Sequence, residues 1–294
     1  MGIPFEEIDY NMKISIITIN FNNRDGLKNT IESVVNQTYN DIQYIVIDGG
    51  STDGSAEIIK EYTNRINYWV SEPDKGIYNA MNKGFDAAKG EYCLFLNSGD
   101  TLHQDTTIET VVKSDLQSDL IMGLVEYVPS KRIGYKDVKY PITLLNFYKG
   151  APVPHPATFI KCHLLNRFRY DENLKIVSDW KFFLQTIIIE GCSYNKLDLV
   201  VTDFLEGGIS GNRDLAELER QKVFEELFPY GVRLDYVQFL NGNGYNETDY
   251  DRFFIKLKDY RYSKAVYSLS VLLVRFVSLF KSSAKFARKF PLSK

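Results

Sequence analysis

The stretch Phe95-Leu96-Asn97-Ser98-Gly99-Asp100 places a carboxylate directly after an apolar run that begins at Tyr92. We expect this run to be a buried strand that carries Asp100 to the carboxyl edge of a sheet, where open α/β sheets bind their ligands. An Asp among short polar groups suits a divalent cation that holds phosphates. The alternative is an ordinary turn, because Asn, Ser, Gly and Asp are the commonest turn residues.

Two further acids follow predicted strands in the same way. Asp48 closes the run from Ile42 to Ile47, and Asp74 lies in the loop after the run from Ile66 to Val70. Carboxylates gathered at one sheet edge repel one another unless a cation or a donor-rich ligand lies among them. The three acids together therefore favour a binding site over three unrelated turns.

Strand-like and helix-like segments alternate over the first hundred residues. We expect strands at 13–19, 42–47, 66–70 and 91–96, with apolar residues at helical spacing between them. This alternation predicts an α/β fold, with a Rossmann-like, mostly parallel sheet flanked by helices. Later segments predict a strand from Asp119 to Tyr127, a helix from Ile176 to Glu190, and helices from Arg213 onward.

Three common classes of enzyme lack their motifs here. Gly49 and Gly54 have the spacing of a P-loop, but no Lys follows Gly54 to reach the phosphates. No G-x-G-x-x-G follows the first predicted strand, and a Gly-x-Ser-x-Gly elbow is missing from the sequence. These observations count against kinase-like, dehydrogenase-like and hydrolase-like chemistry.

The overall composition is that of a soluble globular protein, with 44% hydrophobic and 25% charged residues among 294. Cys93, Cys162 and Cys192 show no Cys-x-x-Cys spacing, which argues against a zinc site or a disulfide framework. Residues 1–12 have no basic region followed by an apolar one, so we expect no signal peptide and a cytoplasmic protein.

Five motifs follow one another between Ser15 and Asp100. They are Ser15-Ile16-Ile17-Thr18-Ile19-Asn20-Phe21-Asn22, Ser33-Val34-Val35-Asn36-Gln37-Thr38-Tyr39, Ile47-Asp48-Gly49-Gly50-Ser51-Thr52-Asp53-Gly54-Ser55, Glu72-Pro73-Asp74-Lys75-Gly76-Ile77-Tyr78-Asn79-Ala80-Met81-Asn82-Lys83-Gly84, and Gly90-Glu91-Tyr92 leading into the stretch that ends at Asp100. In this order they resemble the nucleotide-sugar half of the family 2 inverting glycosyltransferases of the bacterial surface-polysaccharide type. The resemblance continues more weakly around His155 and Asp179, and it fades beyond Ser210.

The resemblance implies a GT-A fold and a division of the chain. Residues 1–12 would be an N-terminal tail, and residues 13–210 a glycosyltransferase domain. Its first half, 13–100, would bind the nucleotide-sugar, and 101–210 would face the acceptor. Residues 211–294 would form a helical C-terminal region.

The resemblance also assigns roles to residues at the sheet edge. The nucleotide-sugar donor would be bound by Thr18, Asn20, Asp48, Gly49, Asp74, Lys75, Asn97 and Ser98, although Lys75 could equally be a solvated lysine. Asp100 would hold a divalent metal, Mn²⁺ or Mg²⁺. His155 would supply a second metal ligand or donate to the diphosphate, or it would merely pack in its proline-rich loop.

Two positions depart from the family pattern. The family often has a second Asp in the loop after its second strand, where it contacts the pyrimidine base, and this chain has Gly49 there. The metal motif carries Asn97 and Gly99 where acids are common, which leaves Asp100 as its only carboxylate. One carboxylate with diphosphate oxygens and waters still suffices for Mg²⁺ or Mn²⁺.

Inverting transfer needs one general base, and the resemblance places Asp179 in that role. The alternative for Asp179 is an acid favoured by a helix N-terminus. The implied function is transfer of a sugar, most simply from a UDP-sugar, to a hydroxyl of a glycan or polyprenyl-linked acceptor in surface polysaccharide biosynthesis. A nucleotide-sugar-binding protein without transferase activity is the alternative. A nucleotidyltransferase would carry a glycine-rich basic loop after the first strand, which is absent, and we expect no nucleic-acid partner.

The charge of the chain is unevenly distributed. Residues 261–294 carry eight Lys and Arg and no acid, and because the whole chain is −3 the first 260 residues carry −11. The apolar segment 265–280 contains Arg275 and is shorter than the roughly 20 residues that span a bilayer. We therefore expect a basic amphipathic helix that lies on an anionic membrane surface, at the inner face of the cytoplasmic membrane. The alternative is a helix that packs on the body or on a second subunit as a homodimer.

Overall fold

The computed structural model describes residues 13–114, 117–207 and 212–240. The predicted tail 1–12, the predicted boundary near residue 210 and the basic segment 261–294 lie outside these residues. The chain divides into two compact units, residues 1–228 and 229–294. The described part of the second unit contains one helix, α9 (Tyr230–Leu240).

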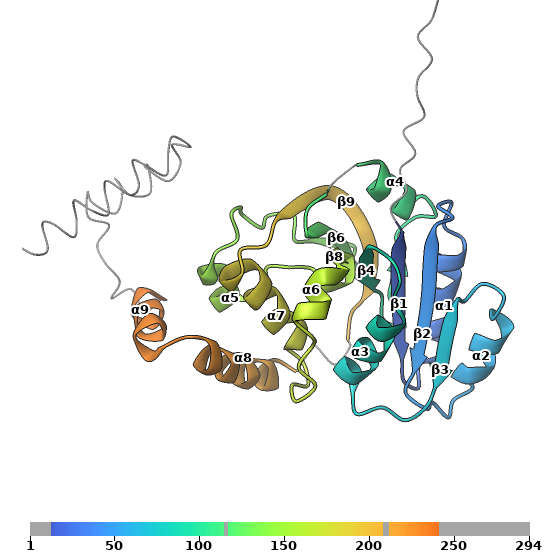
Figure 1. Ribbon diagram of the computed structural model, residues 1–294, viewed down its shortest axis with the longest axis horizontal. Helices are drawn as coiled ribbons and strands as arrows, with labels where there is room; N and C mark the ends of the chain where they lie inside the picture. The colour runs from blue at the N-terminus through green and yellow to red at the C-terminus, as the bar shows by residue number, and fades with distance from the viewer. Residues whose placement is uncertain (1–12, 115–116, 208–211, 241–294) are drawn as a thin grey trace, which may run out of the picture. The chain divides into compact units, whose positions relative to one another are not determined.

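The first unit contains all the other elements, which Figure 1 shows in their arrangement. In chain order they are β1 (Ile14–Asn20), α1 (Arg24–Val35), β2 (Ile42–Asp48), α2 (Ser55–Glu61), β3 (Tyr68–Ser71), α3 (Ile77–Ala87), β4 (Tyr92–Phe95), β5 (Thr101–Leu102), α4 (Thr107–Lys113), β6 (Leu120–Val128), β7 (Arg132–Gly134), α5 (Leu144–Lys149), the 3₁₀ turn η1 (His155–Ala157), β8 (Thr158–Lys161), α6 (Cys162–Arg167), α7 (Ser178–Phe183), the π-helical turn η2 (Leu184–Ile189), β9 (Tyr194–Leu205) and α8 (Arg213–Leu227).

The strands form one sheet in the order β3-β2-β1-β4-β8-β6-β9-β5, with β7 paired to β6. The first four strands along this order are all parallel, and they correspond to the four strands that the first hundred residues predict. β8 runs antiparallel to both of its neighbours, and β6 runs parallel to β9. In β1 and β2, Asn20 and Asp48 are register partners. The last residues of the parallel strands therefore gather at one edge of the sheet.

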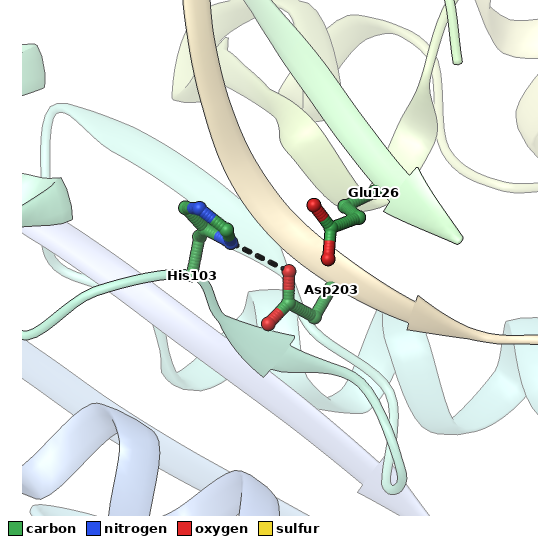
Figure 2. A group of neighbouring side chains, drawn as sticks. All are labelled: His103, Glu126 and Asp203. Atoms are coloured by element: carbon green, nitrogen blue, oxygen red, sulfur yellow. Dashed lines mark hydrogen bonds and ion pairs between the residues drawn. The ribbon is translucent and has the colours of Figure 1, made fainter. Parts of the chain in front are cut away.

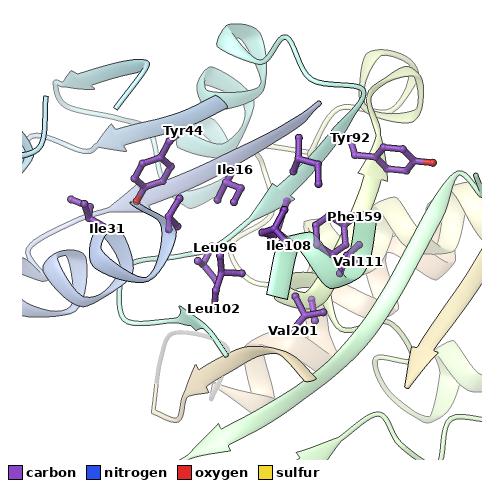
Figure 3. Packing of buried hydrophobic residues seen from close by; sticks show 14 of the residues in the cluster. Ile16, Ile31, Tyr44, Tyr92, Leu96, Leu102, Ile108, Val111, Phe159 and Val201 are labelled. Carbon is purple, nitrogen blue, oxygen red and sulfur yellow. The ribbon is translucent and has the colours of Figure 1, made fainter. Parts of the chain in front are cut away.

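One cluster of the hydrophobic core lies on the face of the sheet that α1, α2 and α4 cover (Figure 3). Ile16 of β1 and Leu94 of β4 are fully buried there, together with Ile31 of α1 and Ile108 of α4. Because successive side chains of a strand point to opposite faces, the neighbouring Ile17 lies on the other face. Helix α3 covers that face so closely that a Cβ on Gly84 would lie 2.4 Å from the Cγ2 atom of Ile17. Gly84 is therefore required for α3 to approach the sheet.

Two features of the second half differ from the sequence prediction. Strand β9 was not predicted, because its segment mixes apolar residues with exposed charged ones such as Asp198. The predicted helix from Ile176 to Glu190 begins at Ser178 and changes to a π-helical turn at Leu184. Among the described residues, no helix is long and apolar enough to cross a membrane.

Candidate active site

The carboxylate of Asp48 organises the edge of the sheet between β1 and β2. It is fully buried and accepts hydrogen bonds at one oxygen from Asn20 Nδ2, at 2.7 Å, and from Ser51 Oγ, at 2.6 Å. Its other oxygen accepts from Ser51 N, at 3.0 Å, and from Ser71 Oγ, at 2.6 Å. The side chain thus joins the ends of three strands and the loop that follows β2.

These donors keep Asp48 ionised. Burial by itself would raise the pKa of Asp48, but the hydrogen bonds from Ser51, Ser71 and Asn20 together lower it below its ordinary value. Since four donors occupy the carboxylate, the structure favours a supporting role for Asp48 beneath the loop. Thr18 is also fully buried, with its hydroxyl 3.1 Å from that of Tyr44, so it lies below the surface of the site.

Gly49 and Asp74 occupy the same small volume beside this carboxylate. A Cβ on Gly49 would lie 2.5 Å from Asp74 Oδ2 and 3.2 Å from the ring of Phe21. Asp74 is held in place by the backbone N–H of Gly76, which donates to its Oδ1 at 2.8 Å. A carboxylate at position 49, which the family pattern often has, would have to displace the Asp74 carboxylate from its present place.

The loop from Asn97 to Asp100 is fixed by helix α1. Asn23 Nδ2 donates to the carbonyl of Ser98 at 2.9 Å, and Thr30 Oγ1 donates to the carbonyl of Asp100 at 2.7 Å. Gly99 has a φ of +105°, a conformation that favours glycine, and this explains why no acid stands at that place in the motif. The buried Oδ1 atoms of Asn20 and Asn97 have no hydrogen-bond partner among the described residues. Both are therefore unsatisfied acceptors buried near this edge of the sheet.

Asp100 is buried in a different way from Asp48. Its side chain is 4% exposed and accepts one hydrogen bond, from the backbone N–H of Leu205 at 3.0 Å. Burial raises its pKa to about 7, because no lysine, arginine or histidine of the described chain offsets the loss of water. Because only one hydrogen bond reaches this carboxylate, its remaining oxygen lone pairs can bind a cation. The structure therefore fits the metal role that the sequence predicts for Asp100.

Asp179 lies in the first turn of α7, on the far side of helix α3. The hydroxyl of Tyr78 lies 3.0 Å from Asp179 Oδ1 and 2.5 Å from the carbonyl oxygen of Ile176. Burial, followed by the charge of Asp179, raises the pKa of Tyr78 well above its usual value, so its hydroxyl keeps its proton. Tyr78 has one proton for these two acceptors, and its donation can therefore pass between them.

The first turn of α3 connects the two ends of the site. Asp74, next to Gly49, precedes this helix, and Tyr78, next to Asp179, lies within its first turn. Between them Lys75 is exposed, and its backbone N–H donates to Asn79. The short segment 74–78 therefore contains Asp74, which is predicted to bind the nucleotide-sugar, and Tyr78, which contacts the predicted general base Asp179.

His155 is packed into an aromatic cluster. It is 7% exposed, its Nε2 lies 2.8 Å from the hydroxyl of Tyr170, and its ring stacks on Phe95 at 5.4 Å between centroids. Burial lowers the pKa of His155, and the charge of Asp179 opposes this effect more weakly. Of the alternatives that the sequence left open, these contacts favour a packed, hydrogen-bonded histidine over a metal ligand.

A second group of possible metal ligands was missed by the sequence analysis. Figure 2 shows His103 beside Asp203, with its Nδ1 2.7 Å from Asp203 Oδ1, and Glu126 next to them. Glu126 and Asp203 are register partners on β6 and β9, and one ligand atom of each of the three residues lies within 4.8 Å of the others. Lys131 donates to Glu126 at 2.7 Å, so one carboxylate of this cluster already has a cationic partner. Only the pairing of distant strands creates it, and no sequence motif could have revealed it.

Replacing Asp100 by Asn should stabilise the metal-free protein at pH 8. The folded-state pKa of Asp100 is about 7 and its ordinary value is 3.8, so this group costs stability progressively as the pH rises from about 4 to about 7. The variant avoids a cost on the order of a few kcal/mol. Thermal melts at pH 5 and pH 8 measure the difference, with the exposed Asp105→Asn as control. A variant less stable than wild type at pH 8 would contradict this expectation.

Because a side chain at position 49 would overlap the Asp74 carboxylate, we expect a substitution at position 74 to compensate for one at position 49. Gly49→Asp alone should lower stability by about 1–3 kcal/mol, because its Cβ overlaps the Asp74 carboxylate. Adding Asp74→Gly should restore most of that loss. Thermal melts of the two single variants and the double variant give the coupling free energy. Strictly additive losses would show that the two side chains do not compete for this space.

Comparison with known proteins places the chain in a family. Residues 15–173 match the family model described as glycosyl transferase family 2. An uncharacterized glycosyltransferase of Mycobacterium tuberculosis is 30% identical over 256 residues, which cover 83% of this chain and 97% of the relative. A PGL/p-HBAD biosynthesis glycosyltransferase of Mycobacterium bovis is 27% identical over 228 residues, which cover 75% and 87% respectively.

Solved structures show the same fold. The crystal structure of Staphylococcus aureus TarS 1–349 in complex with UDP-GlcNAc matches with a TM-score of 0.59 and 22% identity, over 71% of this chain and 65% of that one. The mannosyltransferase PcManGT from Pyrobaculum calidifontis, in complex with GDP-Man and Mn²⁺, matches with a TM-score of 0.52 and 16% identity, over 72% and 61%. The predicted GT-A fold is thereby confirmed. The family match and the relatives together establish that this chain belongs to glycosyl transferase family 2 and is a glycosyltransferase.

Proposed function

We propose that this enzyme transfers a sugar from a UDP-sugar to a hydroxyl of a glycan or polyprenyl-linked acceptor, with inversion, in surface polysaccharide biosynthesis. The observation that carries the proposal is the position of the segment 74–78 at the start of α3. Asp74 lies against Gly49, where the nucleotide-sugar is predicted to bind, and Tyr78 contacts Asp179, the predicted general base. The residues proposed for binding the nucleotide-sugar and for removing the proton are thus both in contact with the segment at the start of α3.

The donor end suits a pyrimidine nucleotide. Phe21, which is 64% exposed, offers a ring face at the end of β1, and Asp74 Oδ2 lies beside it. An aromatic face supports a base, and a carboxylate accepts the N–H of a uracil edge. The UDP-GlcNAc complex of TarS, a protein with the same fold, supports the choice of UDP. Asn20 and Asn97 add unpartnered amide oxygens nearby.

Asp100 is the residue we assign to Mn²⁺ or Mg²⁺. Its buried, uncompensated carboxylate fits a cation, and the complex of PcManGT with Mn²⁺ supports a metal in this fold. When bound, the ion would stabilise the negative charge of the departing diphosphate. The chain's own contribution is to hold Asp100 through Leu205 N and to hold its loop through Asn23 and Thr30.

Asp179 is the residue we assign as general base. Inverting transfer proceeds by a single displacement, so one carboxylate that accepts the proton of the acceptor hydroxyl suffices. Asp179 is partly exposed, and the Tyr78 hydroxyl lies 3.0 Å from its Oδ1. This arrangement leaves the carboxylate accessible to an acceptor while one of its oxygens is oriented by Tyr78. It also favours transfer over the alternative of nucleotide-sugar binding alone.

Hydrolysis of nucleotide-sugars tests this function. In the presence of Mn²⁺, the wild-type enzyme should release nucleoside diphosphate slowly from at least one donor in a panel of UDP-GlcNAc, UDP-glucose, UDP-galactose and GDP-mannose. Asp179→Asn should bind that donor with unchanged affinity by calorimetry and lose roughly 10²–10⁴-fold in turnover, the usual contribution of a general base. The exposed Asp198→Asn on β9 is the matched control. Full turnover in Asp179→Asn would remove this residue from the mechanism.

We further propose that residues 261–294, which lie outside the described residues, bind an anionic membrane surface. Their eight basic residues and absence of acids carry this proposal, and a lipid-linked acceptor would explain its use. The full chain should co-sediment with vesicles that contain phosphatidylglycerol, and less so at high salt. Charge reversal of Lys281, Lys285, Arg288 and Lys289 to Glu should abolish this binding. Equal binding by the reversed chain would contradict the proposal.

A further inference from the structure

Helix α8 carries a buried carboxylate that the proposed chemistry does not use. Glu219 is 5% exposed, and its Oε1 accepts a hydrogen bond from the backbone N–H of Lys175 at 2.7 Å. Its Oε2 accepts from the backbone N–H groups of Ile176, at 2.9 Å, and Val177, at 3.2 Å. One side chain therefore satisfies three consecutive backbone donors of a segment far from it in the sequence.

That segment leads directly into the helix that carries Asp179. Val177 is the N-cap residue of α7, and its own side chain cannot accept a hydrogen bond. The carboxylate of Glu219 takes the place of such a cap from another element, and its negative charge suits a helix N-terminus. The carbonyl group of Ile176 faces the opposite way and accepts from Tyr78, which also contacts Asp179.

Two further contacts join α8 to the same helix. The buried Lys181 of α7 donates to both carboxylate oxygens of Glu226, each at 2.8 Å, and the ring of Trp180 meets that of Phe224 edge-on at 5.1 Å between centroids. Glu219 and Glu226 are two helical turns apart and so lie on one face of α8. Asp179 thus has neighbours on both sides, Val177 and Lys181, that α8 holds in place.

We propose that Glu219 is a positioning residue for the general base. It sets the direction of Asp179 by fixing the segment 175–177 and, through the carbonyl of Ile176, the hydroxyl of Tyr78. Helix α8 lies beyond the part of the chain that the family model matches, yet it belongs to the catalytic apparatus. This inference rests on the proposed role of Asp179.

The test compares Glu219→Gln with Glu217→Gln, an exposed glutamate on the same helix. A glutamine amide has only one oxygen to offer, so it cannot satisfy all three backbone donors. With the donor hydrolysed fastest in the panel above, Glu219→Gln should lower kcat by about 10²-fold, the effect expected of a small displacement of a catalytic group. Its KM and its calorimetric Kd for the donor should change by less than about threefold, and Glu217→Gln should match wild type.

A second comparison shows whether Glu219 acts through Asp179. In an Asp179→Asn background, Glu219→Gln should cost less than about threefold in kcat, because residues that act as a unit are not additive. Hydrogen exchange should also quicken at the amides of residues 175–177 in Glu219→Gln and stay unchanged in Glu217→Gln. If Glu219→Gln does not fold, Tyr78→Phe is measured in both backgrounds with the same expectation.

The outcomes are distinct. An unchanged kcat in Glu219→Gln, or an equal loss in both backgrounds, overturns the positioning role. If Tyr78→Phe is used instead, an unchanged kcat or an equal loss of kcat in both backgrounds likewise overturns the positioning role. A wild-type enzyme that hydrolyses no donor in the panel, or an Asp179→Asn variant with full turnover, overturns the proposed function instead. The inference is supported if Glu219→Gln lowers kcat strongly in the wild-type background and lowers it little further in the Asp179→Asn background.

Discussion

The in-register pairing of Asn20 with Asp48 is the interaction on which the rest of the site depends. It brings the ends of β1 and β2 level and places a buried anion between them. Ser51 and Ser71 then tie the loop after β2 and the end of β3 to the same carboxylate. Because an ionised group in a protein interior must find donors, the backbone around Asp48 has one favourable arrangement. Gly49 and Asp74 owe their places to it.

The two buried aspartates at this edge of the sheet, Asp48 and Asp100, have different roles because their surroundings differ. Asp48 receives four hydrogen bonds and has a lowered pKa, whereas Asp100 receives one and has its pKa raised to about 7. The first is saturated and acts as part of the framework. The second is left under-satisfied, and such a group gains most from a cation. Both acids follow apolar runs in the sequence, so the difference between them comes from the donors that packing supplies.

Much of the first half could be predicted from the sequence, because runs rich in β-branched residues that end at Asn20 and Asp48 mark β1 and β2, and the apolar run from Tyr92 to Leu96 marks β4. β3 begins at Tyr68 and not at Ile66, since the N–H of Ile66 still bonds back to Tyr62. The contacts of Asp74 with Gly49 and of Glu219 with residues 175–177 join distant segments, and tertiary packing alone creates them. The sequence left His155 open between a metal ligand and a packed histidine, and its enclosure by Phe95 and Tyr170 arises only from tertiary packing.

The shared space of residues 49 and 74 also constrains how this enzyme could have diverged from relatives that carry an acid at position 49. A chain cannot hold both carboxylates at once without displacing one, since the Cβ of the first would meet the oxygen of the second. An acid gained at position 49 would therefore have to be accompanied by a new rotamer of Asp74 or by the loss of that side chain.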